Sequence, residues 1–298
     1  MGHGHHHHHH HHETGNLKVA FFLNLGFTII EIIGGLMTNS LAILSDALHD
    51  LGDSLSLGLS WYFQELSNKG STRKFSYGFA RFSILGAIIN SIVLVVGSIF
   101  ILIKAIPELW GPEPVNAQGM MLLSILGILV NGAAVLRLKN GDSMNERVVS
   151  LHLLEDVLGW TAVLIGSIVM IFVDALWIDP FLSILISAYI LFNVYRNLKE
   201  SLVIVLQGAP QDISIENIHK RLGEISEVCD VHDCHVWSMD GEYHILTVHL
   251  QIKEDYRLSE LQPLKKQIQE KLAHESIDHV TVEFENEGED CLNKNCTE

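Results

Sequence analysis

The sequence S-L-A-I-L-S-D-A-L-H-D-L-G-D at residues 40–53 decides the fold of this chain. It opens an apolar segment, 41–66, that is long enough to cross a bilayer as a helix. Within it, His49 and Asp53 are four residues apart, and residues with this spacing lie on the same face of a helix. The segment therefore predicts a membrane-spanning helix that presents one imidazole and one carboxylate side by side.

The same H-x-x-x-D spacing recurs in a second long apolar segment, 142–173, at His152 and Asp156. Two such helices packed face to face would bring two nitrogen and two oxygen ligands around one point. A tetrahedral set of this kind suits a divalent metal of borderline softness, zinc first. Asp50 and Glu155 lie about 100° away around their helices and are left out of the ligand set.

The expected depths of the two pairs agree. At the helical rise per residue, Asp53 lies roughly 18 Å from the start of its helix and His152 roughly 15 Å from the start of the other. Because the two helices enter from opposite sides, both pairs fall near the middle of a core about 30 Å thick. A lone buried Asp or His is often a structural hydrogen-bonding group, but two matched pairs favour a transport pathway for a metal ion.

Composition supports a membrane protein with an acidic extension. The 298 residues have a mean hydropathy of +0.27 and a formal net charge of −16. The acidic excess gathers after Gln207. This charge suits cations and argues against nucleic acid as a partner. We expect no cleavable signal peptide, because no charged region with a small-residue cleavage site precedes the first apolar run.

Six apolar segments predict six transmembrane helices, and the loops predict their orientation. Lys and Arg occur in the loops after the second and fourth segments and at the exit of the sixth, whereas the opposite loops have none. Positive loops face the cytoplasm, so both termini are predicted to be cytoplasmic. The expected spans are 17–37, 41–66, 79–106 (ended by Pro107), 118–138, 142–173 and 180–206.

The chain after Gly208 predicts a small α+β domain. A helix over 213–225, strands over 228–238 and 243–253, a second helix over 258–273 (with Ser259 as a cap) and a last strand over 279–285 give the order αββαβ. Asp240-Gly241 is the expected hairpin turn. The expected organisation is a disordered His-rich tail at 1–16, native or a purification tag; a transmembrane domain at 17–207; the α+β domain at 208–286; and a tail at 287–298.

These motifs together resemble the cation diffusion facilitator family, in its zinc-exporting branch. The resemblance runs from residue 17 to residue 285. Besides the six spans, it rests on four stretches: residues 40–53, F-S-Y-G-F-A-R at 75–81, H-L-L-E-D at 152–156 and V-H-D-C-H-V-W at 231–237.

The resemblance implies a homodimeric zinc/proton antiporter in the bacterial inner membrane, with a transport site of His49, Asp53, His152 and Asp156. Other divalent cations, Cd²⁺ or Co²⁺, are possible cargo. Relatives that accept cadmium as readily as zinc have an aspartate in the position of His49, so this histidine favours zinc. No metal is expected in the loop at 67–77, which has neither Asp nor His.

The resemblance also implies a metallochaperone-like cytoplasmic domain that dimerises and binds zinc as a regulatory ligand. Its expected ligands are His235 and His249, on paired strands, and Glu285. Some relatives add a C-terminal cysteine pair, which Cys291 and Cys296 resemble at a wider spacing. The remaining histidines of the domain are expected to be surface or structural, and Cys229 and Cys234 to be small core residues. The histidines in question are His232, His244, His274 and His279.

Two other classes of function, a membrane zinc sensor and a zinc hydrolase, fit the sequence less well. A membrane zinc sensor without transport would need an output module, and none is visible. A zinc hydrolase would need an open coordination position and a base, whereas four protein ligands close the site and no H-E-x-x-H occurs. The sequence therefore predicts a transporter and not an enzyme.

Overall fold

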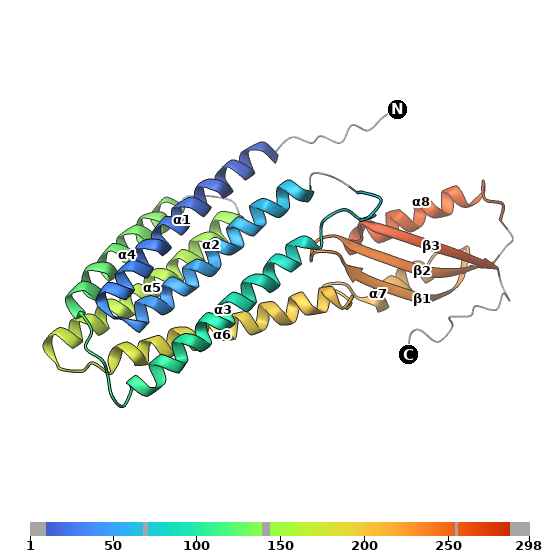
Figure 1. Cartoon of the computed structure of the whole chain (residues 1–298). Helices are drawn as coiled ribbons and strands as arrows, with labels where there is room; N and C mark the ends of the chain where they lie inside the picture. The colour runs from blue at the N-terminus through green and yellow to red at the C-terminus, as the bar shows by residue number, and fades with distance from the viewer. Residues whose placement is uncertain (1–9, 68–70, 139–143, 254–255, 287–298) are drawn as a thin grey trace. The chain divides into compact units, whose positions relative to one another are not determined.

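The computed structural model describes residues 10–67, 71–138, 144–253 and 256–286 (Figure 1). Contacts divide the chain into two compact units: residues 1–69 and 86–198, which hold most of the six long helices, and residues 70–85 and 199–298, which hold the C-terminal domain. Each unit is described by itself. Residues 1–9 of the expected tail at 1–16 lie outside the described residues. Residues 10–16 belong to the first helix.

Six long helices form the membrane domain, as predicted. Five of them are apolar and long enough to cross a bilayer, counting only the described residues. The exception is α2, which carries the first H-x-x-x-D pair and several other polar residues. Pro107 does not end α3 as expected, because the helix continues for one more residue. The helices are α1 (His10–Thr38), α2 (Leu41–Ser67), α3 (Phe82–Glu108), α4 (Ala117–Leu138), α5 (Met144–Phe172) and α6 (Ile178–Val205).

Within this domain α1, α2, α4 and α5 pack together (Figure 1), while α3 meets α6 where Leu94 packs with Ile190 and Val194. Trp160 of α5 is buried in the centre of the four-helix group, where it packs with Ile43 of α2 and Met120 of α4. Glycine permits the closest approach: a Cβ added to Gly127 of α4 would lie 2.4 Å from the Trp160 ring. Small residues at helix contacts are a common device of membrane proteins.

The start of α2 is fixed by a residue far away in the sequence. The Asp179 carboxylate accepts hydrogen bonds from the Ser40 hydroxyl at 2.5 Å and from the Leu41 amide at 2.8 Å. One turn further along, the hydroxyls of Ser45 and Ser183 are 2.8 Å apart. The carboxylate satisfies amides that a helix start leaves without partners. Since α2 carries two of the expected metal ligands, these bonds to α6 also fix the height of the ligands.

The C-terminal domain has the predicted αββαβ order. Its elements are α7 (Ile215–Gly223), β1 (Val228–Ser238), β2 (His244–Ile252), α8 (Leu261–Leu272) with the short 3₁₀ turn η1 (Ala273–Glu275), and β3 (His279–Asn286). The three strands are ordered β1-β2-β3, with β1 and β2 antiparallel and β2 and β3 parallel. The expected cap of α8 is wrong, because the helix begins after Glu260, without a side-chain cap, and not at Ser259.

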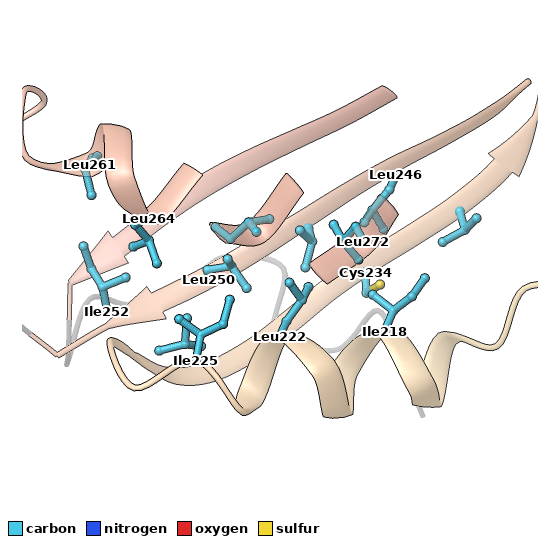
Figure 2. Close-up of a cluster of buried hydrophobic side chains, with 14 of the residues drawn as sticks. Ile218, Leu222, Ile225, Cys234, Leu246, Leu250, Ile252, Leu261, Leu264 and Leu272 are labelled. Carbon is cyan, nitrogen blue, oxygen red and sulfur yellow. The ribbon is translucent and has the colours of Figure 1, made fainter. Parts of the chain in front are cut away.

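Both helices of this domain cover one face of the sheet. Figure 2 shows the core that they share, in which Ile218 and Leu222 of α7 and Leu264 of α8 meet Leu246 and Leu250 of β2. The apolar residues of α7 and α8 recur at helical spacing and those of β2 alternate, so each element buries one face. The opposite face of the sheet is left to carry polar side chains.

Candidate metal centre

The two H-x-x-x-D pairs come together between α2 and α5. His49, Asp53 and His152 each offer a ligand atom, and these atoms lie within 4.8 Å of one another. The closest pair is His152 Nε2 and Asp53 Oδ2, at 3.0 Å, and the two imidazole rings have centroids 5.7 Å apart. These distances fit a set of ligands that could close on one metal ion by small side-chain movements.

Asp156 approaches the same centre from α5. Its Oδ1 is 3.9 Å from His49 Nε2, which in turn is 3.9 Å from Asp53 Oδ2. Asp156 is thus in contact with one member of the group, although it is not one of the three residues whose ligand atoms all lie within 4.8 Å. The arrangement offers two nitrogens and two carboxylates, a donor set whose two negative charges match one divalent cation.

Asp50 and Glu155, which were not expected to be ligands, do not join this group. Glu155 accepts a hydrogen bond from the Tyr189 hydroxyl at 2.9 Å. The Asp50 carboxylate is buried and interacts electrostatically with the carboxylate of Glu31 on α1. Asp46 is also buried, a turn before His49 on α2. Spacing alone could have pointed to Asp46, which shares a helix face with His49 and Asp53, whereas nothing local in the sequence pointed to Glu31.

A second group of ligands lies on the polar face of the C-terminal sheet. His232 of β1, His249 of β2 and Glu285 of β3 offer ligand atoms within 4.8 Å of one another. Glu285 contacts both imidazoles, with Oε2 3.1 Å from His232 Nε2 and Oε1 2.9 Å from His249 Nδ1. Asp230 lies 2.9 Å from His232 Nδ1. A carboxylate on the far ring nitrogen of this kind orients an imidazole for metal binding.

This group corrects one expected residue. His235 was expected to pair with His249, but it lies opposite Thr247, and His232 lies opposite His249. The cause is an irregularity of register between His232 and His235, where Asp233 has a positive φ of 47°. His235 is not one of the three residues of the group, and its Nε2 contacts Asp233 Oδ1 at 2.8 Å, while Asp233 Oδ2 lies 3.3 Å from His249 Nε2. His232, expected to be a surface or structural residue, takes its place.

The other histidines and cysteines of the domain have varied positions. His244 is structural, as expected, with Nδ1 3.0 Å from the Ser276 carbonyl, and His279 packs on the Tyr77 ring. Cys234 is a core residue as expected, and burial beside Asp233 raises the pKa of its thiol to about 11. Cys229 is exposed and not in the core. Cys291, Cys296 and the side chain of His274 lie outside the described residues.

The structure thus combines long apolar helices, typical of a membrane protein, with two imidazoles and two carboxylates that meet between α2 and α5. Two family models match this chain, one described as the cation efflux transmembrane domain over residues 17–206 and one as the cation efflux protein cytoplasmic domain over residues 210–287. The chain therefore belongs to the cation efflux family of transporters, and the resemblance seen in its motifs is confirmed.

Several curated bacterial proteins are similar over nearly their whole length. The zinc transporter ZitB of Escherichia coli (strain K12) is 35% identical over 303 residues, covering 98% of this chain and 96% of the relative. The cadmium, cobalt and zinc/H(+)-K(+) antiporter of Bacillus subtilis (strain 168) is 34% identical, covering 96% and 93%. The metal cation efflux system protein CzcD of Cupriavidus metallidurans is 32% identical, covering 96% and 90%.

Proposed function

We propose that this transporter exports Zn²⁺ from the cytoplasm in exchange for protons. The observation that carries the proposal is the meeting of His49, Asp53 and His152 within 4.8 Å, with Asp156 3.9 Å from His49. Two imidazoles favour a borderline metal over Mg²⁺ or Ca²⁺, which prefer oxygen ligands alone. The names of the relatives, which include zinc, cadmium and cobalt, support the same class of cargo.

The proposed exchange with protons follows from charge. When a divalent ion leaves, the carboxylates of Asp53 and Asp156 stand bare in a medium where uncompensated charge is costly. Protons relieve that cost by binding to the same carboxylate and imidazole lone pairs that hold the metal. Metal and protons then compete for one set of atoms, so the exit of one favours the entrance of the other.

The C-terminal domain is proposed to regulate transport as part of a homodimer, with both termini in the cytoplasm. A zinc ion there would be held by His232, His249 and Glu285. This donor set fits the metal because Asp230 already orients the His232 ring. The ion would supply positive charge to an acidic domain and tie β1, β2 and β3 together, which stabilises the form that binds it. Cys291 and Cys296 stay candidates for a further contribution.

Transport in proteoliposomes tests the proposal. Purified full-length protein is reconstituted, and Zn²⁺, Cd²⁺, Co²⁺ and Mn²⁺ are offered separately while metal-sensitive and pH-sensitive dyes report both fluxes. We expect zinc to move fastest and protons to move in the opposite direction whenever zinc moves. If the protein bound zinc but did not transport it, the protein would be a zinc sensor. If zinc flux did not change with an imposed pH gradient, the protein would be a uniporter.

A further inference from the structure

A buried carboxyl group on α1 stands beside the zinc pathway among other acidic groups. Glu31 is only 1% exposed, and among the described residues no hydrogen-bond donor reaches either of its buried carboxylate oxygens. The nearby Thr28 hydroxyl donates to the Asn24 carbonyl, and the Asn24 amide donates to α2. The polar groups closest in sequence are therefore committed elsewhere.

The groups that act on Glu31 are all acidic. They are Asp50 of α2, whose carboxyl group is close enough to share a hydrogen bond with Glu31, Asp46 of α2 and Asp156 of α5. The remaining helix that packs on α1 is α4, whose one ionisable residue is Arg137. Because α4 starts at the level of the α1–α2 turn, this arginine is about 30 Å along α4, at the other side of the membrane from the turn. A bare carboxylate in these surroundings is too costly to persist, so Glu31 must carry a bound cation.

Asp46 provides a second acceptor next to Glu31. It is 6% exposed, and its Oδ2 is buried without a hydrogen-bond partner among the described residues. The only atom that a Cβ on Gly159 of α5 would meet is Asp46 Oδ1, at 3.7 Å, so α5 leaves room in front of this carboxylate. At the helical rise, Asp46 lies about 8 Å and Glu31 about 10 Å from the α1–α2 turn, against about 18 Å for Asp53. Both are thus nearer the turn, the predicted outer side, than the metal ligands.

The coordination around Glu31 indicates which cation it binds. The described residues contain two groups of three or more His, Cys, Asp or Glu ligand atoms within 4.8 Å, and Glu31 belongs to neither. A metal ion there would therefore lack ligands, since even the loosest metal sites in proteins use several oxygens. A proton needs only one carboxylate oxygen and a nearby acceptor.

We propose that Glu31, with Asp46 beside it, is a proton-binding site separate from the metal ligands and is part of the counter-ion pathway. This deepens the proposed function and rests on it. A proton from the outer side forms an O–H bond with a Glu31 oxygen when Zn²⁺ leaves, because the vacated carboxylates then act on Glu31 with their full negative charge. When Zn²⁺ returns, its positive charge disfavours the proton, which is released to water. Zinc and this proton are thereby coupled through charge and not through shared lone pairs.

The test compares Glu31→Gln, Glu31→Asp and Asp46→Asn with the parent in proteoliposomes of the full-length protein. Glu108→Gln, the same change at a carboxylate at the end of α3, is the matched control. Zinc–zinc exchange at equal pH reports the metal site, and zinc accumulation under an imposed pH gradient, with a pH-sensitive dye, reports coupling. Each lost proton removes about a tenfold factor in accumulation per unit of pH gradient.

We expect Glu31→Gln to keep zinc–zinc exchange but to accumulate about tenfold less zinc per unit of pH gradient. Asp46→Asn should also reduce this accumulation. Glu31→Asp, which keeps an acid, should couple better than Glu31→Gln, and Glu108→Gln should behave as the parent.

The reverse order, in which Gln couples as well as the parent and the shorter Asp impairs transport, would show that Glu31 serves packing and would overturn the proposal. The proposal would also be overturned if Glu31→Gln changed only the response of zinc accumulation to a potassium gradient, because the cation bound at Glu31 would then not be a proton. A parent protein that moves no zinc would reject the proposed function and this site with it, whereas full proton coupling in Glu31→Gln would reject this site alone.

Discussion

At the scale of single residues, the proposed transport site consists of four side chains. His49 and Asp53 lie on α2, and His152 and Asp156 lie on α5, so each helix contributes one nitrogen and one carboxylate. Other acidic groups are close, but they face elsewhere: Glu155 contacts Tyr189. The chemistry of the site is therefore set by ligand type and geometry and not by the local amount of negative charge.

Replacing any of the four ligands by alanine should lower zinc transport to background. Removing a group that merely supports a ligand commonly costs about 10- to 100-fold in metal affinity, so losing a ligand should cost at least as much. Zinc flux in proteoliposomes, normalised to reconstituted protein, measures the effect. Glu155→Gln, next to Asp156 on the same helix, is the control and should transport normally. A ligand variant that transports like this control would be removed from the site.

Changing His49 to Asp should shift selectivity toward cadmium. The substitution replaces a nitrogen donor with an oxygen donor and adds a negative charge, and both changes relax the preference for a tetrahedral borderline ion. The ratio of cadmium flux to zinc flux is expected to rise relative to the parent, measured on the same vesicles. An unchanged ratio would mean that other residues set the choice of metal.

At the scale of elements, the ligands are held in place by how α4 and α5 pack. Trp160 lies one turn after Asp156 on α5 and fills the centre of the helix group. Gly127 of α4 is the residue that makes room for its ring. Since α5 carries half of the metal ligands, a displaced Trp160 would tilt or rotate the helix that positions His152 and Asp156.

Gly127→Ala should therefore destabilise the protein and reduce transport, whereas Gly132→Ala on the same helix should do neither. The new methyl group at position 127 would lie 2.4 Å from Trp160, while a Cβ at position 132 meets nothing within 4 Å. Overpacking typically costs about 1–3 kcal/mol, against a gain in helix propensity of about 1 kcal/mol. Thermal unfolding in detergent should show a lower Tm for Gly127→Ala only. Equal Tm values for the two variants would contradict this account of the contact.

At the scale of the whole molecule, the chain has one group of candidate metal ligands in its long helices and a second group on its C-terminal sheet. Each of the three strands supplies one residue of this group, so the group exists only when the sheet is folded. The residues are His232, His249 and Glu285. Metal binding at such a group is linked to the stability of the domain that forms it. This linkage is the physical basis of the regulation that we propose.

His249→Ala should remove activation at low zinc while leaving maximal transport nearly unchanged. His249 contacts Glu285 at the centre of the group, whereas His235 lies outside it, so His235→Ala is the matched control. Calorimetry on the full-length protein should show fewer zinc ions bound per chain for His249→Ala than for the control. If His235→Ala lost the activation and His249→Ala kept it, the ligand set inferred from the sheet would be wrong.

The sequence by itself determined the elements and most of the candidate ligand group between α2 and α5. Apolar length predicted six helices, and a spacing of four residues predicted which side chains share a helix face, because both depend on local geometry alone. The αββαβ order followed from the change of period after Gly208 in the same way.

Only the tertiary structure decided what depends on contacts between distant segments. The irregular register of β1 exchanged His235 for His232 beside His249, and a bulge of this kind cannot be read from alternation, which assumes a regular strand. Asp179 caps α2 from 138 residues away. Glu31 acquires its acidic surroundings only because α1 packs on α2. In each case a side chain takes its role from neighbours that the chain brings together in space, and the periodicity of one segment carries no information about another.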